Sequence, residues 1–100
     1  MVKHIVMWNL KDNAEGCSKE ENIEIMRDKL LALKEMIPEI ISMEVGVNFN
    51  LSDTACDICL VTEFKSGVEL GIYTDHPEHV EVAKFVGKVR ESRVVADYVI

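Results

Sequence analysis

Apolar residues recur at every second position in four stretches of the chain, and this period predicts β-strands. The stretches are residues 3–10, 41–49, 56–64 and 94–100. The first and third are apolar on both faces, which is typical of central strands. The second has one apolar and one polar face, which is typical of a half-buried strand.

A helical pattern follows the first strand. Apolar residues recur there at steps of three and four, as on a helix with one buried face. This stripe consists of Ile23, Met26, Leu30, Leu33 and Ile37. Ser18 and Glu21 predict a capping box at the start of the helix. Pro38 ends the helix, because the residue before a proline is pushed out of the helical region.

Two shorter helical segments are predicted between the third and fourth strands. Ser66 and Glu69 form a second capping box, for a short helix that ends near Tyr73. His76 is then the N-cap of another helix and Pro77 its first residue, a position that suits proline because its missing N–H has no partner within a helix.

The order strand, helix, strand, strand, helix, strand predicts an α+β fold with a four-stranded antiparallel sheet and its helices on one face. The other face then carries Ile5, Met7, Cys59 and Val61 without cover. An uncovered apolar sheet of several hundred Å² is expected to find a partner. We therefore expect a homodimer in which two such faces pack together into a barrel-like core.

Composition narrows the class of protein. One hundred residues with 48% apolar and 29% charged side chains predict a single globular domain over residues 1–100. The net charge of −7 and the lack of a basic stripe argue against nucleic acid and anionic membrane surfaces as partners. No apolar run is long enough to span a bilayer. Three cysteines without a secretory signal suggest reduced thiols and a cytoplasmic location.

The histidines carry the candidate chemistry. His79 falls in the first turn of its helix, where the positive end of the helix dipole disfavours imidazolium, and a neutral imidazole is what a general base requires. Tyr73 lies close enough in sequence to share a pocket with His79 and to polarise a substrate carbonyl. His4 and Trp8 share the helix-facing side of the first strand, where both are candidates for lining that pocket.

Each of these candidate residues also has a structural interpretation. His76 is predicted to cap its helix, His4 and His79 fit hydrogen-bonded core histidines, and Trp8 fits the core. His76 and His79 have a spacing of three but no clear third ligand, so we predict no metal site. No phosphate loop or nucleophile elbow is present, so the sequence supports no covalent mechanism, and we predict no cofactor. Cys56 and Cys59 form a C-x-x-C on a strand, where an offset of three puts them on opposite faces, so we predict no redox or zinc role.

Three segments together resemble the stress-responsive dimeric α/β-barrel (Dabb) family. They are the opening KHIVMWNLK, the Y-x-x-H-P-x-H of Tyr73, His76, Pro77 and His79, and the closing DYVI. The resemblance covers the whole chain and implies a ferredoxin-like fold and a homodimer whose sheets form a barrel. One branch, which resembles plant olivetolic acid cyclase, closes linear polyketides by an aldol step with a tyrosine and a histidine. Carried over by motif, these residues are Tyr73 and His79, with His4 in the same pocket.

The leading hypothesis is a Dabb homodimer that binds a small apolar or aromatic carbonyl compound between sheet and helices. Its chemistry as an enzyme is cofactor-free and cyclase-like, with His79 as base and Tyr73 as polarising donor. One alternative is a non-catalytic stress-response or interaction module whose histidines are structural. Another, implied by related dimeric barrels, is a cofactor-free oxygenase or a haem-degrading enzyme.

Overall fold

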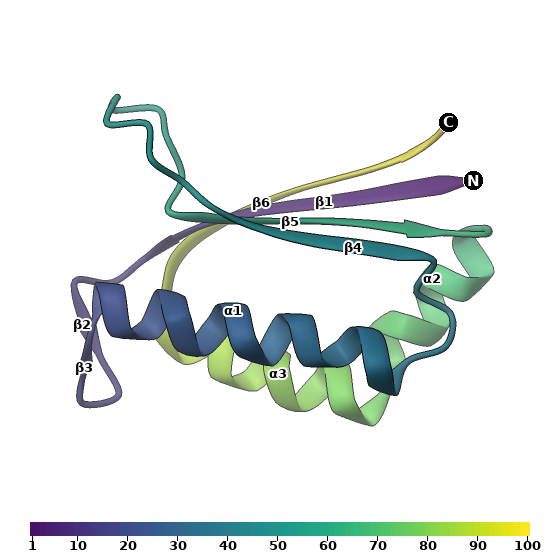
Figure 1. The fold of residues 1–100 in the computed structure, drawn as a ribbon, viewed down its shortest axis with the longest axis horizontal. Coiled ribbons are helices and arrows are strands. Elements are labelled where there is room, and N and C mark those ends of the chain that lie inside the picture. Colours follow the sequence, from purple (N-terminus) through teal and green to yellow (C-terminus); the bar gives the residue numbers. More distant parts are fainter.

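A computed structural model describes residues 1–100 as two layers, a sheet and the helices that cover one of its faces (Figure 1). The elements are β1 (Val2–Leu10), β2 (Asn13–Ala14), β3 (Cys17–Ser18), α1 (Lys19–Met36), β4 (Ser42–Val47), β5 (Ile58–Phe64), α2 (Gly67–Asp75), α3 (Pro77–Val89) and β6 (Arg90–Val99). Both termini lie at the same end of the sheet, and the N–H of Ile100 donates to the carbonyl of Met1.

The main sheet has the strand order β4-β5-β1-β6, and all its neighbouring strands are antiparallel. The predicted ferredoxin-like α+β fold is confirmed, with α2 and α3 together in the place of the second helix. β1 and β5 are the central strands, as their two-sided apolar pattern predicts. Burial alternates strictly along β5, because successive side chains point to opposite faces.

The core lies between the inner face of the sheet and the helices. It contains most of the stripe on α1, with Met26, Leu33 and Ile37 fully buried. From the sheet it receives Val6, Leu10, Ile58, Leu60 and Phe64. This half of the molecule is packed as the sequence pattern predicts.

Helix starts follow the local signals with one difference. The capping box of α1 is confirmed, since the N–H of Glu21 donates to the Ser18 hydroxyl and the N–H of Ser18 donates to the Glu21 carboxylate, at 3.2 and 3.0 Å. At α2 the predicted second box is not formed. There the Ser66 hydroxyl accepts from the N–H of Val68 and donates to the carboxylate of Glu69. The Glu69 carboxylate therefore bonds the hydroxyl of Ser66 in place of its backbone N–H.

Several boundaries differ from the prediction. The second predicted strand was to reach Phe49, but β4 ends at Val47, which pairs with Ile58. The N–H of Asn48 still donates to the carbonyl of Asp57 at 3.0 Å, and the Asn48 side chain then bonds the backbone of Asn50, which turns the chain into a loop. Phe49 is instead 94% exposed on the loop that projects from the sheet (Figure 1). The last strand begins at residue 90, four residues earlier than predicted.

The connection between the first strand and α1 is an unpredicted hairpin of β2 and β3. Its two turn residues have positive φ, 51° at Glu15 and 76° at Gly16, as tight hairpin turns require. The buried amide of Asn22 in α1 donates to the carbonyl of Ala14 at 3.0 Å. This bond fastens the hairpin to the helix.

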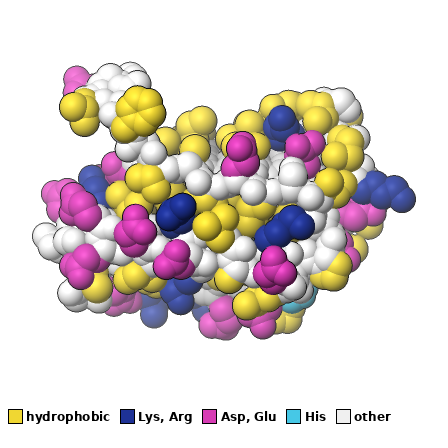
Figure 2. Space-filling model, viewed as in Figure 1, with side chains coloured by type: hydrophobic (Ala, Val, Ile, Leu, Met, Phe, Trp, Pro, Cys, Tyr) yellow, Lys and Arg dark blue, Asp and Glu magenta, His cyan; other side chains and the backbone are white.

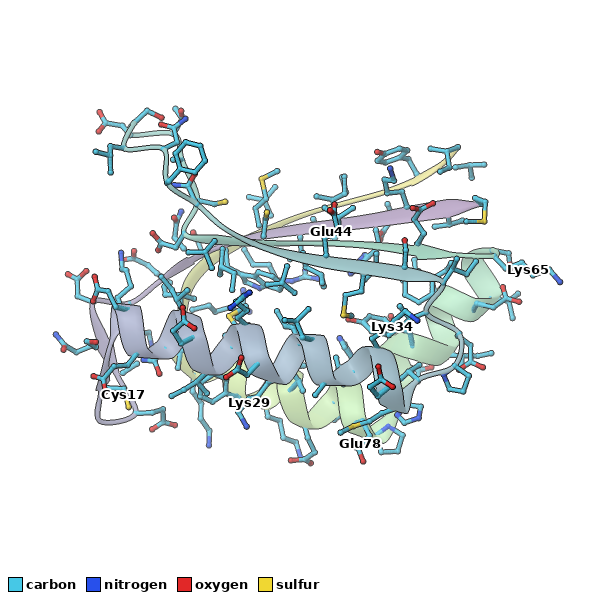
Figure 3. The ribbon with its side chains drawn as sticks, in the orientation of Figure 1. Cys17, Lys29, Lys34, Glu44, Lys65 and Glu78 are labelled. Carbon is cyan, nitrogen blue, oxygen red and sulfur yellow. The ribbon has the colours of Figure 1, made fainter.

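The outer face of the sheet has no helix over it. Hydrophobic side chains line the upper rim of the molecule in Figure 2, where this face is seen edge-on. Strand alternation puts Ile5, Met7, Cys59, Val61, Val94, Ala96 and Tyr98 on this outer face. Glu44 also extends from β4 away from the helices (Figure 3). The apolar outer face predicted from the sequence is therefore present. No helix of the chain is long and apolar enough to cross a membrane.

Candidate functional site

A cavity of about 250 Å³ lies on the inner side of the sheet, between β1, β6 and the two later helices. It is lined by His4, Trp8, Leu30, Leu60, Tyr73, His79, Val82, Ala83, Val86, Gly87, Arg90 and Arg93. The four residues that the sequence places in a site therefore meet at one cavity. β1 supplies His4 and Trp8, α2 supplies Tyr73 and α3 supplies His79. Their roles stay a prediction at this point.

Tyr73 lies at the centre of an aromatic cluster. Its ring is 4.4 Å from that of His79, 5.1 Å from that of Phe64 and 6.1 Å from that of His4, between ring centroids. The residue is 1% exposed, and its hydroxyl has no hydrogen-bond partner. Burial raises the pKa of Tyr73 to about 12, so the phenol stays protonated and keeps a hydrogen to donate.

His79 is held by one ring nitrogen. Its Nδ1 lies 2.9 Å from the carbonyl oxygen of Thr74, which can only accept, so Nδ1 carries the hydrogen and Nε2 of the neutral ring keeps its lone pair. Burial lowers the pKa of His79, and the nearby charges of His4, Arg93 and His76 lower it further, whereas the bond to Thr74 raises it. The neutral bias argued from the helix dipole has this direction, but burial is its main cause.

His4 is buried on β1 with a carboxylate beside it. Its Nδ1 bonds the side chain of Asp97, which lies directly across the β1–β6 ladder. The hydroxyl of Thr62, on β5, donates to the His4 carbonyl at 3.3 Å. Asp97 therefore serves as the acidic partner of His4.

Trp8 is 5% exposed, and its indole N–H has no acceptor. A buried donor without a partner costs about 1–3 kcal/mol, which makes such groups rare. Two of the three unpartnered buried polar groups of the chain, the Trp8 N–H and the Tyr73 hydroxyl, belong to residues that line this cavity. Together they suit a ligand that brings hydrogen-bond acceptors.

Arg90 and Arg93 are site residues that the sequence reasoning missed. The predicted strand began at residue 94, which left both arginines outside any element. The available signal was the strand period, since Arg93 shares its face with Val95 and Asp97 once the strand is extended. Arg90 and Arg93 are exposed, whereas Tyr73 on the same cavity is buried.

Other candidate residues lie outside the cavity. His76 caps α3, and its Nδ1 accepts from the N–H of Glu78 at 3.1 Å, as predicted. All three cysteines are free thiols, and burial, followed by the neighbouring Cys59, raises the pKa of Cys56 away from a reactive thiolate. No group of three or more His, Cys, Asp or Glu side chains is arranged to hold a metal ion.

Comparison with known proteins gives a family and a fold. A model of the Stress responsive A/B Barrel Domain (Dabb) matches residues 2–100. A dimeric protein of unknown function with a ferredoxin-like fold from Bacteroides fragilis NCTC 9343 is 33% identical, with a TM-score of 0.84 over 99% of this chain and 95% of that chain. No functionally curated protein matches the chain.

Two further solved structures share the fold at lower identity. A dimeric ferredoxin-like protein of unknown function from Thermobifida fusca is 20% identical, with a TM-score of 0.85 over 99% of this chain and 90% of that chain. The hydroxynitrile lyase from Passiflora edulis is 21% identical, with a TM-score of 0.84 over 99% of this chain and 92% of that chain.

Proposed function

The chain belongs to the stress-responsive A/B barrel (Dabb) family, and we propose that it binds a small apolar or aromatic carbonyl compound and moves a proton on it without a cofactor. Tyr73 and His79 are the proposed catalytic residues, and His4 and Trp8 the proposed substrate-binding residues. A hydroxynitrile lyase of the same fold supports the idea that this fold can carry an active site.

One observation carries the proposal. The buried Tyr73 hydroxyl has no partner, and it belongs to a ring packed against His79, whose Nδ1 is fixed by the Thr74 carbonyl. In a purely structural role, the desolvation cost of the Tyr73 hydroxyl is not offset by any hydrogen bond. A ligand oxygen would accept that hydrogen bond. This arrangement favours a ligand site over the alternative of a non-catalytic interaction module.

The chemistry follows from the protonation states. Tyr73 donates its hydrogen bond to the carbonyl oxygen, and Nε2 of His79 removes a proton from the carbon beside that carbonyl. The electrons of the broken C–H bond form the enolate, whose oxygen the Tyr73 hydroxyl stabilises. In a cyclase-like reaction the enolate carbon attacks a second carbonyl of the same molecule, and the imidazolium returns its proton to the new alkoxide.

The size of the cavity limits the ligand. Sites for drug-sized molecules usually measure about 300–1,000 Å³, and this one measures about 250 Å³. Its walls are mainly apolar, with Leu30, Leu60, Val82 and Val86 among them. A compact apolar or aromatic ketone therefore fits better than an extended chain.

Deuterium exchange at the carbon beside a carbonyl tests the proton-transfer step. Phenylacetone and phenylpyruvate are incubated in D₂O with the protein, and the loss of their benzylic proton signals is followed by NMR. We expect His79→Gln to abolish the enzymatic exchange and Tyr73→Phe to slow it by roughly 10²–10³-fold.

His76→Asn is the matched control. His76 caps the same helix without lining the cavity, and asparagine is a strong N-cap, so this variant should exchange at the wild-type rate. Exchange by His79→Gln at the wild-type rate would refute His79 as the base. No exchange above the spontaneous rate with either ketone, together with no binding of either, would remove the proposed function.

We further propose that the chain forms a homodimer through the outer face of the sheet. Relatives of the same fold are described as dimeric, and the apolar outer face is uncovered in a single chain. Met7 on this face and Met36 on α1 are matched, at 46% and 48% exposure. Met7→Lys should give a monomer in analytical ultracentrifugation and Met36→Lys should stay dimeric, whereas an unchanged mass for both would place the interface elsewhere.

We also propose a cytoplasmic location, which the three free thiols support.

A further inference from the structure

We infer that the ligand of the cavity is an anion, a small apolar carbonyl compound that also carries a carboxylate held by Arg93 and Arg90. This inference rests on the proposed function and narrows its substrate class. The carbonyl end lies with Tyr73 and His79, and the carboxylate lies with the two arginines.

The charged side chains that line the cavity are both positive. The chain has only three arginines and a net charge of −7, yet two of the three arginines line this cavity. None of the twelve lining residues is an aspartate or glutamate. Five ion pairs of the structure have Lys19, Lys84, Lys88 or Arg27 as their cation, and a further contact joins His4 to Asp97. Arg90 and Arg93 therefore bring positive charge to the cavity without an acidic partner.

The nearest carboxylate on the same strand face is already engaged. Asp97 follows Arg93 by four residues on β6, so both point to the inner side of the sheet. Its side chain bonds His4 and does not line the cavity. This leaves the two guanidinium groups free for a ligand.

A second donor faces the same place. Arg93 lies directly opposite Trp8 in the β1–β6 ladder, and the buried indole N–H of Trp8 has no acceptor. A carboxylate accepts hydrogen bonds through two oxygens, and a guanidinium presents planar paired donors that match them. A ligand carboxylate can therefore satisfy both Arg93 and the indole, which a simple ketone cannot do while its single oxygen accepts from Tyr73.

Arg93 also lies within electrostatic reach of the proposed chemistry. Its positive charge acts to lower the pKa of both Tyr73 and His79. The anion site and the acid/base pair line one cavity of about 250 Å³. Arg90 lies at the end of α3 and pairs with Leu10, two residues along β1 from Trp8.

The test compares two ketones that differ in one group. Phenylpyruvate carries a carboxylate where phenylacetone carries a methyl group, so their binding difference measures the anion site. Trp8 is the only tryptophan, and its single indole N–H signal in a ¹H–¹⁵N NMR titration reports binding at the cavity. We expect phenylpyruvate to bind at least about tenfold more tightly than phenylacetone, as hydrogen bonds to a charged group predict.

The arginines are then changed singly. Arg93→Gln should weaken the binding of phenylpyruvate by about tenfold or more, and Arg90→Gln should weaken it by a smaller factor. The binding of phenylacetone should be unaffected by either change. Arg27→Gln, on the surface of α1, is the matched control and should change neither. Thermal melting and sedimentation of each variant confirm that fold and mass are unchanged.

Each other outcome overturns the inference. Equal binding of the two ketones to the wild-type protein would remove the anion site and leave the proposed carbonyl chemistry standing. Unchanged phenylpyruvate binding in both arginine variants would have the same effect. Loss of the dimer in Arg93→Gln, with no preference for phenylpyruvate in the wild type, would assign the arginine to the subunit interface.

Discussion

The inner face of the sheet is built in two different ways along its width. Under α1, side chains such as Leu33 and Ile58 are at most 1% exposed and fill the space between helix and sheet. Between β1, β6 and α3 the same face leaves a cavity, with the Tyr73 hydroxyl and the Trp8 N–H buried and unpaired. The first region is optimised for packing, while the second gives up packing and hydrogen bonds that a ligand can restore. Substitutions in the two regions should therefore differ in size and in sign.

The largest effect is expected in the packed region. Leu33→Ala removes a buried side chain and leaves a cavity, which should lower the free energy of unfolding by about 2–5 kcal/mol. Leu31→Ala, at an exposed position of the same helix, should change it by less than about 0.5 kcal/mol. Urea denaturation of both variants measures the difference. Similar losses at both positions would contradict the distinction between the core side and the solvent side of α1.

In the cavity region a substitution should raise the free energy of unfolding instead of lowering it. Tyr73→Phe removes a hydroxyl that is buried without a partner, so the free energy of unfolding should rise by about 1 kcal/mol. Thr62→Val is the matched change, because the Thr62 hydroxyl is equally buried but donates to the His4 carbonyl, and its loss should cost about 1 kcal/mol. Destabilisation by Tyr73→Phe would indicate that its hydroxyl is satisfied in solution.

The third effect concerns pH. Burial lowers the pKa of His79 below its ordinary value of 6.5. A general base acts in its neutral form, so the exchange rate should fall to half its maximum at a pH below 6.5. NMR titration of the His79 ring should give its midpoint on the same side of 6.5. A midpoint above 6.5 would mean that the ring is more solvated or paired with an acid.

The smallest effect tests the link between the two ends of the cavity. The charge of Arg93 contributes to the lowered pKa of His79, after burial and the charge of His4. Arg93→Gln should therefore move the His79 midpoint upward, towards but not up to 6.5. Arg27→Gln should leave it in place. Equal midpoints in the Arg93 variant and the wild type would separate the anion site from the base.

Local signals predicted much of this molecule because they act through neighbouring residues. The Ser18–Glu21 box, the stripe on α1 and the His76 cap all depend on contacts within a turn or two of helix, and all three are present. The end of β4 was missed because strand alternation continues to Phe49, whereas the chain turns at Asn48, whose side chain bonds the backbone of Asn50. The spacing of Tyr73 and His79 pointed to a shared pocket. Arg93 was missed because its approach to Trp8 depends on the register of β1 with β6, which no local pattern specifies.

The pairing of β1 with β6 also bears on how the protein is made. β1 is the first strand to be synthesised and β6 the last, and the bond between His4 and Asp97 joins residues 93 positions apart. Contacts of such sequence separation form slowly, because the chain must close a long loop before it gains their energy. Until β6 (Arg90–Val99) pairs with β1, one edge of β1 has no partner and neither arginine is in place at the cavity. Completion of the sheet and assembly of the binding site are therefore a single event.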